Sequence, residues 1–361
     1  MSTIQDVARQ AAVSVSTVSN VLNGRTDRMR PETLLRVEAV IAQLQFRPNS
    51  LARRLKTGQT PLLGLLVPSI ANPMYGMIAR AVETFAQEQY GYRVIVGNTY
   101  RERDKEAAFL EDLLAHGVRR VVVISSLADE HHLTQAVERG MVVVSFDRRA
   151  TPGEVSGIDH VTPDNFEAGR LATRHLIAYG HTRLAFATVA GLTVGRNDKI
   201  RGFLAAAAEA GLQQHARILE GGPMNEYGDA AIGEVGRELA KLAARDPHRP
   251  TGVVAVNDMM ALGFMAGLRD AGLLVPHDMS VVGMDGLFLA EIANPALTTL
   301  QLPVTEMARA MVERAMSRQS HLEPAADEQV FPFSRLIERE SVGPPPVSET
   351  KAPITRRKTR Q

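Results

Sequence analysis

Residues 3–24 read TIQDVARQAAVSVSTVSNVLNG, and this stretch decides how the chain begins to fold. Its apolar residues recur at helical spacing in two groups: Ile4, Val7 and Ala8, and then Val18, Val21 and Leu22. Ser14 stands just before the second group, where a helix N-cap is favoured. The pattern predicts two short helices joined by a tight turn.

The second of these helices has a polar face near its N-terminus. Val15, Ser16 and Asn20 lie there, opposite the apolar positions. In a helix-turn-helix, residues at these positions reach base edges in the major groove of DNA. The spacing therefore indicates a DNA-binding module.

The words T-I-Q-D-V-A and V-S-V-S-T-V-S-N-V-L-N-G closely resemble the N-terminal headpiece of the LacI family of bacterial transcription regulators. The chain departs from the family pattern at Ala12, where Gly or Asn is usual, and at Arg30, where a capping Ser is usual. An Ala with positive φ in that turn would be strained. The resemblance implies DNA contacts at Thr3, Val15, Ser16, Thr17, Asn20, Asn23, Arg53, Leu55 and Lys56.

Composition and charge fit this reading. The chain has 361 residues, enough for two or three domains, and 45% of them are hydrophobic. It contains no cysteine, which excludes disulfides and Cys-based metal sites. No apolar run approaches a membrane span and no signal sequence is visible, so we expect a cytoplasmic protein. Basic residues clearly outnumber acidic ones in residues 1–60, although the whole chain carries only +1, which suits a phosphate-binding headpiece on a mildly acidic body.

Residues 31–44 predict a third helix, with Pro31 in its first turn and an apolar face that covers the first two helices. Residues 50–56, SLARRLK, resemble the family's hinge, which is too short to be a stable helix alone. In the family it folds when two copies pack over the minor groove. Leu55 stands where the family inserts a leucine between base pairs.

From Leu62 onward, continuous apolar runs alternate with helical stretches, which predicts parallel sheets covered on both faces. The number of such units favours two lobes. VPSIANPMYGMIARAVE, SFDRR, VTPDNFEAGRLATRHLIAYGH, VNDMMALG and NPALTTLQLP resemble the periplasmic-binding-protein-like core of LacI regulators, so the resemblance runs from about residue 2 to about residue 340. The expected fold is an all-α helix-turn-helix headpiece plus an α/β two-lobed core, each lobe a parallel sheet with helices on both faces.

These patterns predict four regions of the chain. We expect a headpiece over residues 1–49, a hinge helix and linker over 50–61, the core over 62–340, and a disordered basic tail over 341–361. Within the core, the N-lobe is expected to comprise about 62–160 plus 290–325, and the C-lobe about 161–289 plus 326–340. The tail lacks leucine heptads, so we expect a homodimer rather than a tetramer.

Polar residues just past the ends of predicted strands are the candidates for a ligand pocket, because open α/β sheets bind ligands there. The resemblance implies sugar-hydroxyl contacts at six of them: Asn72, Asp147, Arg148, Asn257, Asp285 and Gln301. Tyr75 and Tyr227 are candidates for an apolar wall, whereas Asp258 is interpreted as a helix cap.

Lys199 stands where the family usually has Arg, and Arg196 lies one helical turn earlier. Together with Arg148, these cations could hold a carboxylate, which predicts a sugar acid such as gluconate or a ketogluconate. If Arg196 instead points to solvent and Lys199 pairs with Asp147 or Asp285, the site suits a neutral sugar.

Other classes of protein fit less well. The sequence has no G-x-G-x-x-G after a strand, no P-loop and no G-x-S-x-G, so we expect no enzyme and no cofactor. His131 and His132 are interpreted as a solvated helix start rather than a metal site. A sugar-binding transport protein would share the core but would not carry a basic helix-turn-helix. We therefore expect a homodimeric repressor that binds a near-palindromic operator under the control of a small effector.

Overall fold

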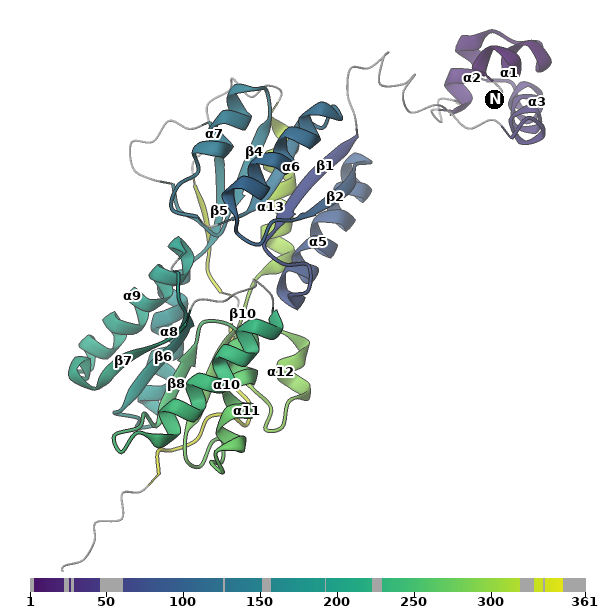
Figure 1. Cartoon of the computed structure of the whole chain (residues 1–361). Helices are drawn as coiled ribbons and strands as arrows, with labels where there is room; N and C mark the ends of the chain where they lie inside the picture. The colour runs from purple at the N-terminus through teal and green to yellow at the C-terminus, as the bar shows by residue number, and fades with distance from the viewer. Residues whose placement is uncertain are drawn as a thin grey trace, which may run out of the picture. The chain divides into compact units, whose positions relative to one another are not determined.

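The computed structural model describes residues 3–22, 26, 29–45, 61–125, 127–150, 157–191, 193–222, 229–318, 328–333 and 335–346. The chain forms two compact units, Met1–Thr60 and Pro61–Gln361 (Figure 1). The division falls at the end of the linker predicted over residues 50–61, and the hinge helix predicted within that segment lies outside the described residues.

The first unit contains α1 (Ile4–Gln10), α2 (Val15–Leu22) and α3 (Pro31–Gln43). Thr3 and Asp6 form a capping box at the start of α1, and the Ser14 hydroxyl accepts a hydrogen bond of 3.1 Å from the backbone amide of Thr17. The three helices bury a small apolar core of Val7, Ala8, Ala11, Val18, Val37 and Val40. The predicted helix-turn-helix with a covering third helix is therefore confirmed.

Both departures noted in the headpiece sequence have structural consequences. Ala12 lies in the turn between α1 and α2 with a φ of 51°, the left-handed conformation that the family's usual Gly or Asn tolerates better. Arg30 occupies the N-cap of α3 and makes no side-chain capping hydrogen bond. Pro31 begins the helix, as predicted.

The second unit is built on two six-stranded sheets, each of which defines a lobe (Figure 1). The N-lobe sheet has the order β11-β5-β4-β3-β1-β2, and all its pairs are parallel. Its strands are β1 (Leu62–Val67), β2 (Arg93–Asn98), β3 (Arg120–Ile124), β4 (Val142–Phe146), β5 (Asp159–Pro163) and β11 (Gln329–Phe331). Its helices are α5 (Pro73–Tyr90), α6 (Arg103–Ala115), α7 (His131–Glu138) and α13 (Val304–Ser317).

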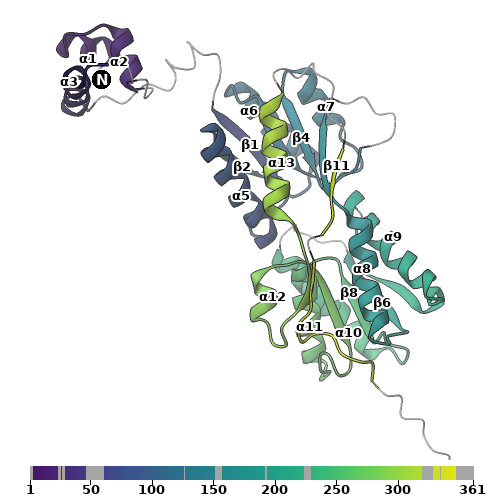
Figure 2. The same cartoon turned by 180° about the vertical axis from the view of Figure 1, so that it is seen from behind.

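Successive residues of these strands point to opposite faces of the N-lobe sheet. Val121 and Val123 of β3 pack with α6 and α7, whereas Val122 and Ile124 pack with α5 and α13. Figure 2 shows α13 and α5 together on one face of the sheet. Burial on both faces explains why β1, β3 and β4 are continuous apolar runs in the sequence.

The C-lobe sheet has the order β12-β10-β9-β8-β6-β7. Its strands are β6 (Leu184–Val189), β7 (Ala216–Gly221), β8 (Gly252–Ala255), β9 (Ser280–Asp285), β10 (Thr298–Gln301) and β12 (Arg335–Ile337). Its helical segments are α8 (Asn165–Ala178), α9 (Val194–Glu209), η1 (Gln213–His215), α10 (Asp229–Arg245), α11 (Asp258–Asp270) and α12 (Phe288–Ile292). Edge strand β12 runs antiparallel to β10, so this sheet is not wholly parallel as predicted.

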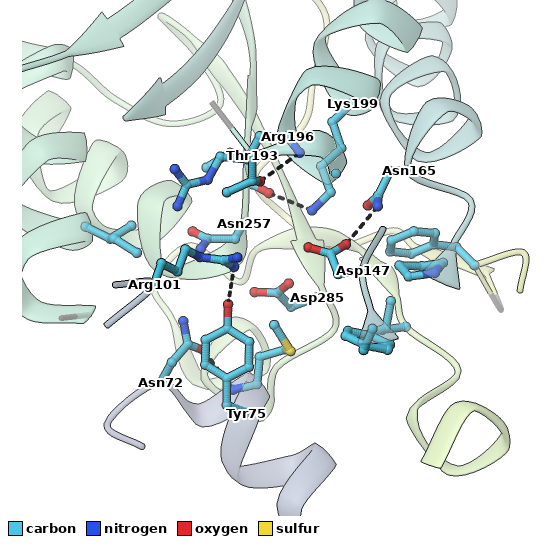
Figure 3. A pocket seen from close by; sticks show the side chains of 18 residues that line it. Asn72, Tyr75, Arg101, Asp147, Asn165, Thr193, Arg196, Lys199, Asn257 and Asp285 are labelled. Atoms are coloured by element: carbon cyan, nitrogen blue, oxygen red, sulfur yellow. Dashed lines mark hydrogen bonds between the residues drawn. The ribbon is translucent and has the colours of Figure 1, made fainter. Parts of the chain in front are cut away.

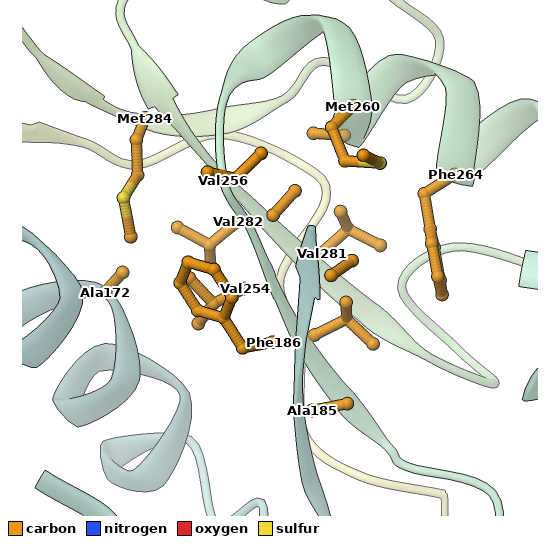
Figure 4. Packing of buried hydrophobic residues seen from close by; sticks show 14 of the residues in the cluster. Ala172, Ala185, Phe186, Val254, Val256, Met260, Phe264, Val281, Val282 and Met284 are labelled. Carbon is orange, nitrogen blue, oxygen red and sulfur yellow. The ribbon is translucent and has the colours of Figure 1, made fainter. Parts of the chain in front are cut away.

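The C-lobe core also has two sides. Figure 4 shows Phe186 and Met284 toward Ala172 of α8, while Met260 and Phe264 of α11 lie on the other side of the sheet. All of these side chains are buried. The sheet is thus covered on both faces, which confirms the expected α/β architecture.

The predicted boundaries of the lobes need three corrections. Residues 290–301 belong to the C-lobe, because Ala290 and Leu297 pack in its core and β10 pairs with β9. Residues 329–331 belong to the N-lobe, because β11 pairs with β5. Residues 341–346 are packed rather than tail: Ser341 is fully buried, and the Gly343 carbonyl accepts a hydrogen bond of 3.1 Å from the Ser280 hydroxyl. The short crossing strands lack the apolar runs by which the other strands were recognised.

Candidate functional site

A pocket of about 590 Å³, part of it open to solvent, lies where the two lobes of the second unit meet. Its polar and charged lining, shown in Figure 3, comes from both lobes: Asn72, Tyr75, Arg101, Asp147, Asn165, Thr193, Arg196, Lys199, Asn257 and Asp285. Most of these residues follow the carboxyl end of a strand or begin the next helix, as expected for a parallel sheet. Apolar groups including Met74, Phe146, Ile232, Leu302 and Phe333 complete the lining.

Two of the predicted asparagines begin helices as well as lining the pocket. The Asn72 side-chain oxygen accepts a hydrogen bond of 2.9 Å from the Met74 amide at the start of α5. The Asn257 oxygen accepts one of 2.8 Å from the Met260 amide at the start of α11. These caps fix the oxygen of each amide group. Capping and pocket lining are therefore combined in the same side chains.

Three features fix the position of the Asp147 carboxylate: its own backbone conformation, a hydrogen bond from α8, and the space left by a glycine in α9. Its φ of 69° turns the chain sharply after β4, and its Oδ1 accepts a hydrogen bond of 2.8 Å from the Asn165 side-chain nitrogen. A Cβ on Gly195, in the first turn of α9, would lie 2.6 Å from the same oxygen. The absence of a side chain at Gly195 thus lets the Asp147 carboxylate approach the helix N-terminus, where negative charge is stabilised.

Asp285, at the end of β9, is backed by a second buried carboxyl group. Burial raises the pKa of Asp285 well above its usual value, and the neighbouring Asp258 carboxylate raises it further. Burial also raises the pKa of Asp258, to about 6, although hydrogen bonds from Thr299 and the Leu287 amide act in the opposite direction. Asp258 is fully buried and does not cap α11, so its predicted capping role belongs to Asn257.

Two cations reach the pocket from α9. The Lys199 ammonium donates a hydrogen bond of 3.1 Å to the Val256 carbonyl, and its charge lowers the pKa values of Asp258 and Asp285. The Arg196 guanidinium donates one of 2.9 Å to the Gly191 carbonyl and is half-buried. Arg196 is thus part of the lining and not a solvated surface residue.

Arg101 is a lining residue that the sequence reasoning missed. Its guanidinium donates a hydrogen bond of 2.8 Å to the hydroxyl of Tyr75, which is itself buried beside the pocket as predicted. A second donation goes to the Ser125 carbonyl. Arg101 follows β2 by three residues, so the same search beyond strand ends would have found it.

Two predicted pocket residues, Arg148 and Gln301, do not line the pocket, and the structure does not test a third, Tyr227. Arg148 points away, because the left-handed backbone of Asp147 turns the chain just before it. Its guanidinium lies 3.2 Å from the buried Glu130 carboxylate and donates to the Ala128 carbonyl. The Gln301 oxygen accepts a hydrogen bond of 3.1 Å from Arg335, which holds it beside β12. Tyr227 lies outside the described residues.

In the first unit, α2 presents the predicted DNA-facing side chains to solvent. Val15 is 43% exposed, and Ser16 and Asn20 are also exposed, whereas Val18 on the opposite face is buried. Thr17 is half-buried, and Thr3 is exposed at the start of α1. The remaining predicted DNA contacts, Asn23, Arg53, Leu55 and Lys56, lie outside the described residues.

The described residues contain neither a metal-binding cluster nor a membrane-spanning helix. No group of three or more potential metal ligands occurs among them, and none of their helices combines the length and apolarity needed to cross a membrane. The interpretation of His131 and His132 as a solvated helix start is wrong for His132. That residue is buried, with its Nε2 atom 2.7 Å from the Glu106 carboxylate.

Each of the two units contains a segment that matches a known protein family. Residues 3–49 match the family described as bacterial regulatory proteins, lacI family. Residues 173–342 match the periplasmic binding protein-like domain. The first match covers the helix-turn-helix and its covering helix, and the second covers most of the C-lobe.

Individual relatives extend the similarity over nearly the whole chain. The HTH-type transcriptional regulator GalR of Escherichia coli K12 is 32% identical over 347 residues, which cover 96% of this chain and 97% of the relative. Catabolite control protein A of Priestia megaterium is 33% identical over 309 residues, 84% of this chain and 89% of the relative.

Solved structures share the fold. The lac repressor dimer bound to operator and the anti-inducer ONPF has a TM-score of 0.78 at 24% identity, covering 95% of this chain and 99% of that one. The transcriptional regulator CelR in complex with cellobiose has a TM-score of 0.66 at 26% identity, covering 94% and 100%. The chain therefore belongs to the LacI family of bacterial regulatory proteins and is a DNA-binding transcriptional regulator.

Proposed function

We propose that the protein is a homodimeric repressor that binds a near-palindromic operator and is controlled by a small sugar-like effector. One observation carries this proposal. The same chain joins a helix-turn-helix that exposes Val15, Ser16 and Asn20 to a core whose two lobes meet at a polar pocket. A DNA-reading module and a polar pocket between two lobes in one chain fit a ligand-responsive regulator.

The pocket's chemistry supports a sugar-like effector. Asn72, Asp147, Asn257 and Asp285 offer amide and carboxyl groups that can make paired hydrogen bonds to neighbouring hydroxyls. The CelR structure holds cellobiose, and a LacI-family regulator from Enterococcus faecium, 25% identical and with a TM-score of 0.68, holds ribose. Arg101, Arg196 and Lys199 add positive charge, which favours a sugar acid such as gluconate or a ketogluconate over a neutral sugar.

The proposed DNA contacts fall into two sets. Thr3, Val15, Ser16, Thr17, Asn20 and Asn23 would serve the major groove, with Val15, Ser16 and Asn20 reading bases. Arg53, Leu55 and Lys56 would serve the minor groove, where Leu55 acts as a wedge between base pairs. Two such sets, one from each protomer, account for a near-palindromic site.

Exposed apolar side chains of the second unit support dimerisation. Ile70, 64% exposed, and Val96 of the edge strand β2 lie on the N-lobe, and α12 of the C-lobe exposes Phe288 and Ile292. A second protomer would bury them. Closure of the lobes on an effector would then shift this interface and the spacing of the hinge segments, provided that the effector binds the two arrangements with different affinity.

A sugar-binding transport protein or sensor could use the same core, but it would leave the helix-turn-helix without a role. The two possibilities separate in a selection experiment. Full-length protein is used to enrich random DNA duplexes, and the enriched duplex is titrated in the presence of sugars and sugar acids. We expect two half-sites related by a dyad and an affinity that changes with one class of ligand. Failure to enrich any sequence would rule out the repressor.

A further inference from the structure

Arg101 occupies an unusual backbone position beside the pocket. Tyr100 and Arg101, with φ values of 56° and 58°, are consecutive non-glycine residues in the left-handed region. The turn is held by backbone hydrogen bonds from Thr99 to Val67 and from Tyr100 to Pro68, each 2.9 Å. Such conformations are costly and tend to persist where they serve a ligand site. The turn directs the Arg101 side chain to the pocket from the N-lobe.

The guanidinium of Arg101 is oriented before any ligand binds. One terminal nitrogen donates to the Tyr75 hydroxyl at 2.8 Å and the other to the Ser125 carbonyl. An oriented planar fork suits a carboxylate, which it binds through two parallel hydrogen bonds.

The other cations of the lining come from the C-lobe. Lys199 and Arg196 lie one turn apart on α9, and Lys199 faces the Asp258–Asp285 pair. Among the described lining residues, Arg101 is the one basic side chain that the N-lobe contributes. Figure 3 shows Arg101 next to Tyr75, and it labels Lys199 among the other side chains that line the pocket.

We propose that Arg101 binds the acidic group of the effector and thereby selects a carboxylated sugar over its neutral counterpart. This inference rests on the sugar-binding role proposed above. Hydroxyls of the same ligand reach Asn257 and Asp285 of the C-lobe, so the acidic group anchors the ligand to one lobe while the hydroxyls engage the other. The sequence suggested Arg148 as a carboxylate-binding residue, but its guanidinium forms an ion pair with Glu130.

The raised pKa of Asp285 supports this charge balance. Burial and the neighbouring Asp258 disfavour the ionised form of Asp285. In its protonated form Asp285 does not repel an anionic ligand, and it can donate a hydrogen bond to a sugar oxygen. The site is thereby better suited to an anion than a count of its acidic residues would indicate.

Calorimetry on full-length protein with matched pairs, D-glucose against D-gluconate and other aldoses against their aldonates, tests the inference. We expect at least one aldonate to bind about tenfold or more tighter than its aldose. Arg101→Gln should weaken the aldonate by about 10- to 100-fold and the aldose by less than about threefold. Arg101→Lys, which keeps the charge but loses the fork, should restore part of the aldonate affinity.

Two further variants test whether the orientation of the Arg101 guanidinium matters and whether the loss of any nearby charge would have the same effect. Tyr75→Phe removes one acceptor that orients the guanidinium and should weaken aldonate binding by about threefold to tenfold. Arg103→Gln removes an equal charge two residues away, where Arg103 pairs with Asp129 in an exposed bridge of 3.0 Å, and should change neither ligand. The thermal midpoint of each variant, measured in parallel, shows whether it is folded.

The outcomes separate this inference from the proposed function. Equal losses for aldose and aldonate in Arg101→Gln, or no loss, would overturn the role of Arg101 and leave the sugar effector standing. Aldoses that bind the unchanged protein as tightly as aldonates would do the same. If no ligand of the panel binds or alters operator affinity, the sugar effector and the role of Arg101 both fail.

Discussion

The backbone amide of Asp258 donates a hydrogen bond of 3.3 Å to the carboxyl group of Asp285. The Asp258 carboxyl group in turn accepts hydrogen bonds from the Leu287 amide at 2.8 Å and from the Thr299 hydroxyl at 2.5 Å. Two buried carboxyl groups therefore lie side by side at the end of β9, one facing the pocket and one fixing the loop before α12. Their raised pKa values follow from this placement.

Burial and the neighbouring Asp258 raise the pKa of Asp285, and an amide imitates the protonated form that this shift favours. Asp285→Asn has nearly the shape and hydrogen-bonding groups of the protonated acid, so we expect effector affinity to change by less than about threefold. Asp285→Leu removes those groups and should weaken binding by about tenfold or more. Calorimetry at pH 7 compares the two, and an equally large loss in both would show that the ionised carboxylate is the binding form.

Asp258 should make stability depend on pH. Its pKa is raised from 3.8 to about 6 in the folded protein, so the folded state holds the proton more tightly than the unfolded state. The stability from this group is fully present below pH 3.8 and is lost as the pH rises through about 6.

The variant Asp258→Asn does not titrate and isolates this effect. Between pH 4 and pH 7.5, the free energy of unfolding of the unchanged protein should fall relative to that of the variant, by at most about 3 kcal/mol. Urea unfolding at both pH values measures the difference. A gap that stays constant, or that moves in the other direction, would contradict the assignment.

The left-handed Ala12 should limit the stability of the headpiece. Ala12→Gly relieves the strain of a φ of 51° and should stabilise residues 1–60 by up to about 1 kcal/mol. Ala42→Gly, at an exposed position within α3, should instead destabilise them by about 1 kcal/mol. Thermal unfolding of the isolated segment distinguishes them; destabilisation by both would refute the strain at Ala12.

Close packing of α8 on α9 should be essential to the pocket. A Cβ on Gly202 would lie 1.9 Å from the Phe166 carbonyl oxygen, so the two helices must separate in Gly202→Ala. We expect a loss of about 2 kcal/mol or more and weaker effector binding, because α8 carries Asn165 and α9 carries Lys199. Gly76→Ala of α5 is the control, since its Cβ would meet nothing within 4 Å. Equal stability of both variants would contradict the prediction.

Much of the fold follows from local signals in the sequence. The headpiece helices are marked by apolar periodicity and by Ser14, and the strands buried on both faces are marked by apolar runs such as VVVSF. Strands β5, β7, β11 and β12 were not predicted, because DHVTP, ARILEG, QVF and RLI are short or partly polar. These segments form strands because they pair with neighbouring strands of the two sheets, which is a tertiary requirement that local pattern does not encode.

The candidate pocket was predicted to a similar extent. Residues beyond strand ends, such as Asn72 and Asp285, meet in the lining because parallel strands end at one edge. Arg148 was misplaced, because the direction of a side chain after a left-handed residue such as Asp147 depends on backbone angles that the sequence does not state. Arg101 depends on a similar turn after β2.

The division of labour between the two units is the central claim, and truncation tests it most directly. Operator binding and effector binding are measured for the full-length protein and for a chain that begins at Thr60. We predict that the shorter chain binds the effector with unchanged affinity and loses specific operator binding, because the exposed face of α2 is gone. Specific operator binding that survives the truncation, or effector binding that is lost with it, would contradict the account.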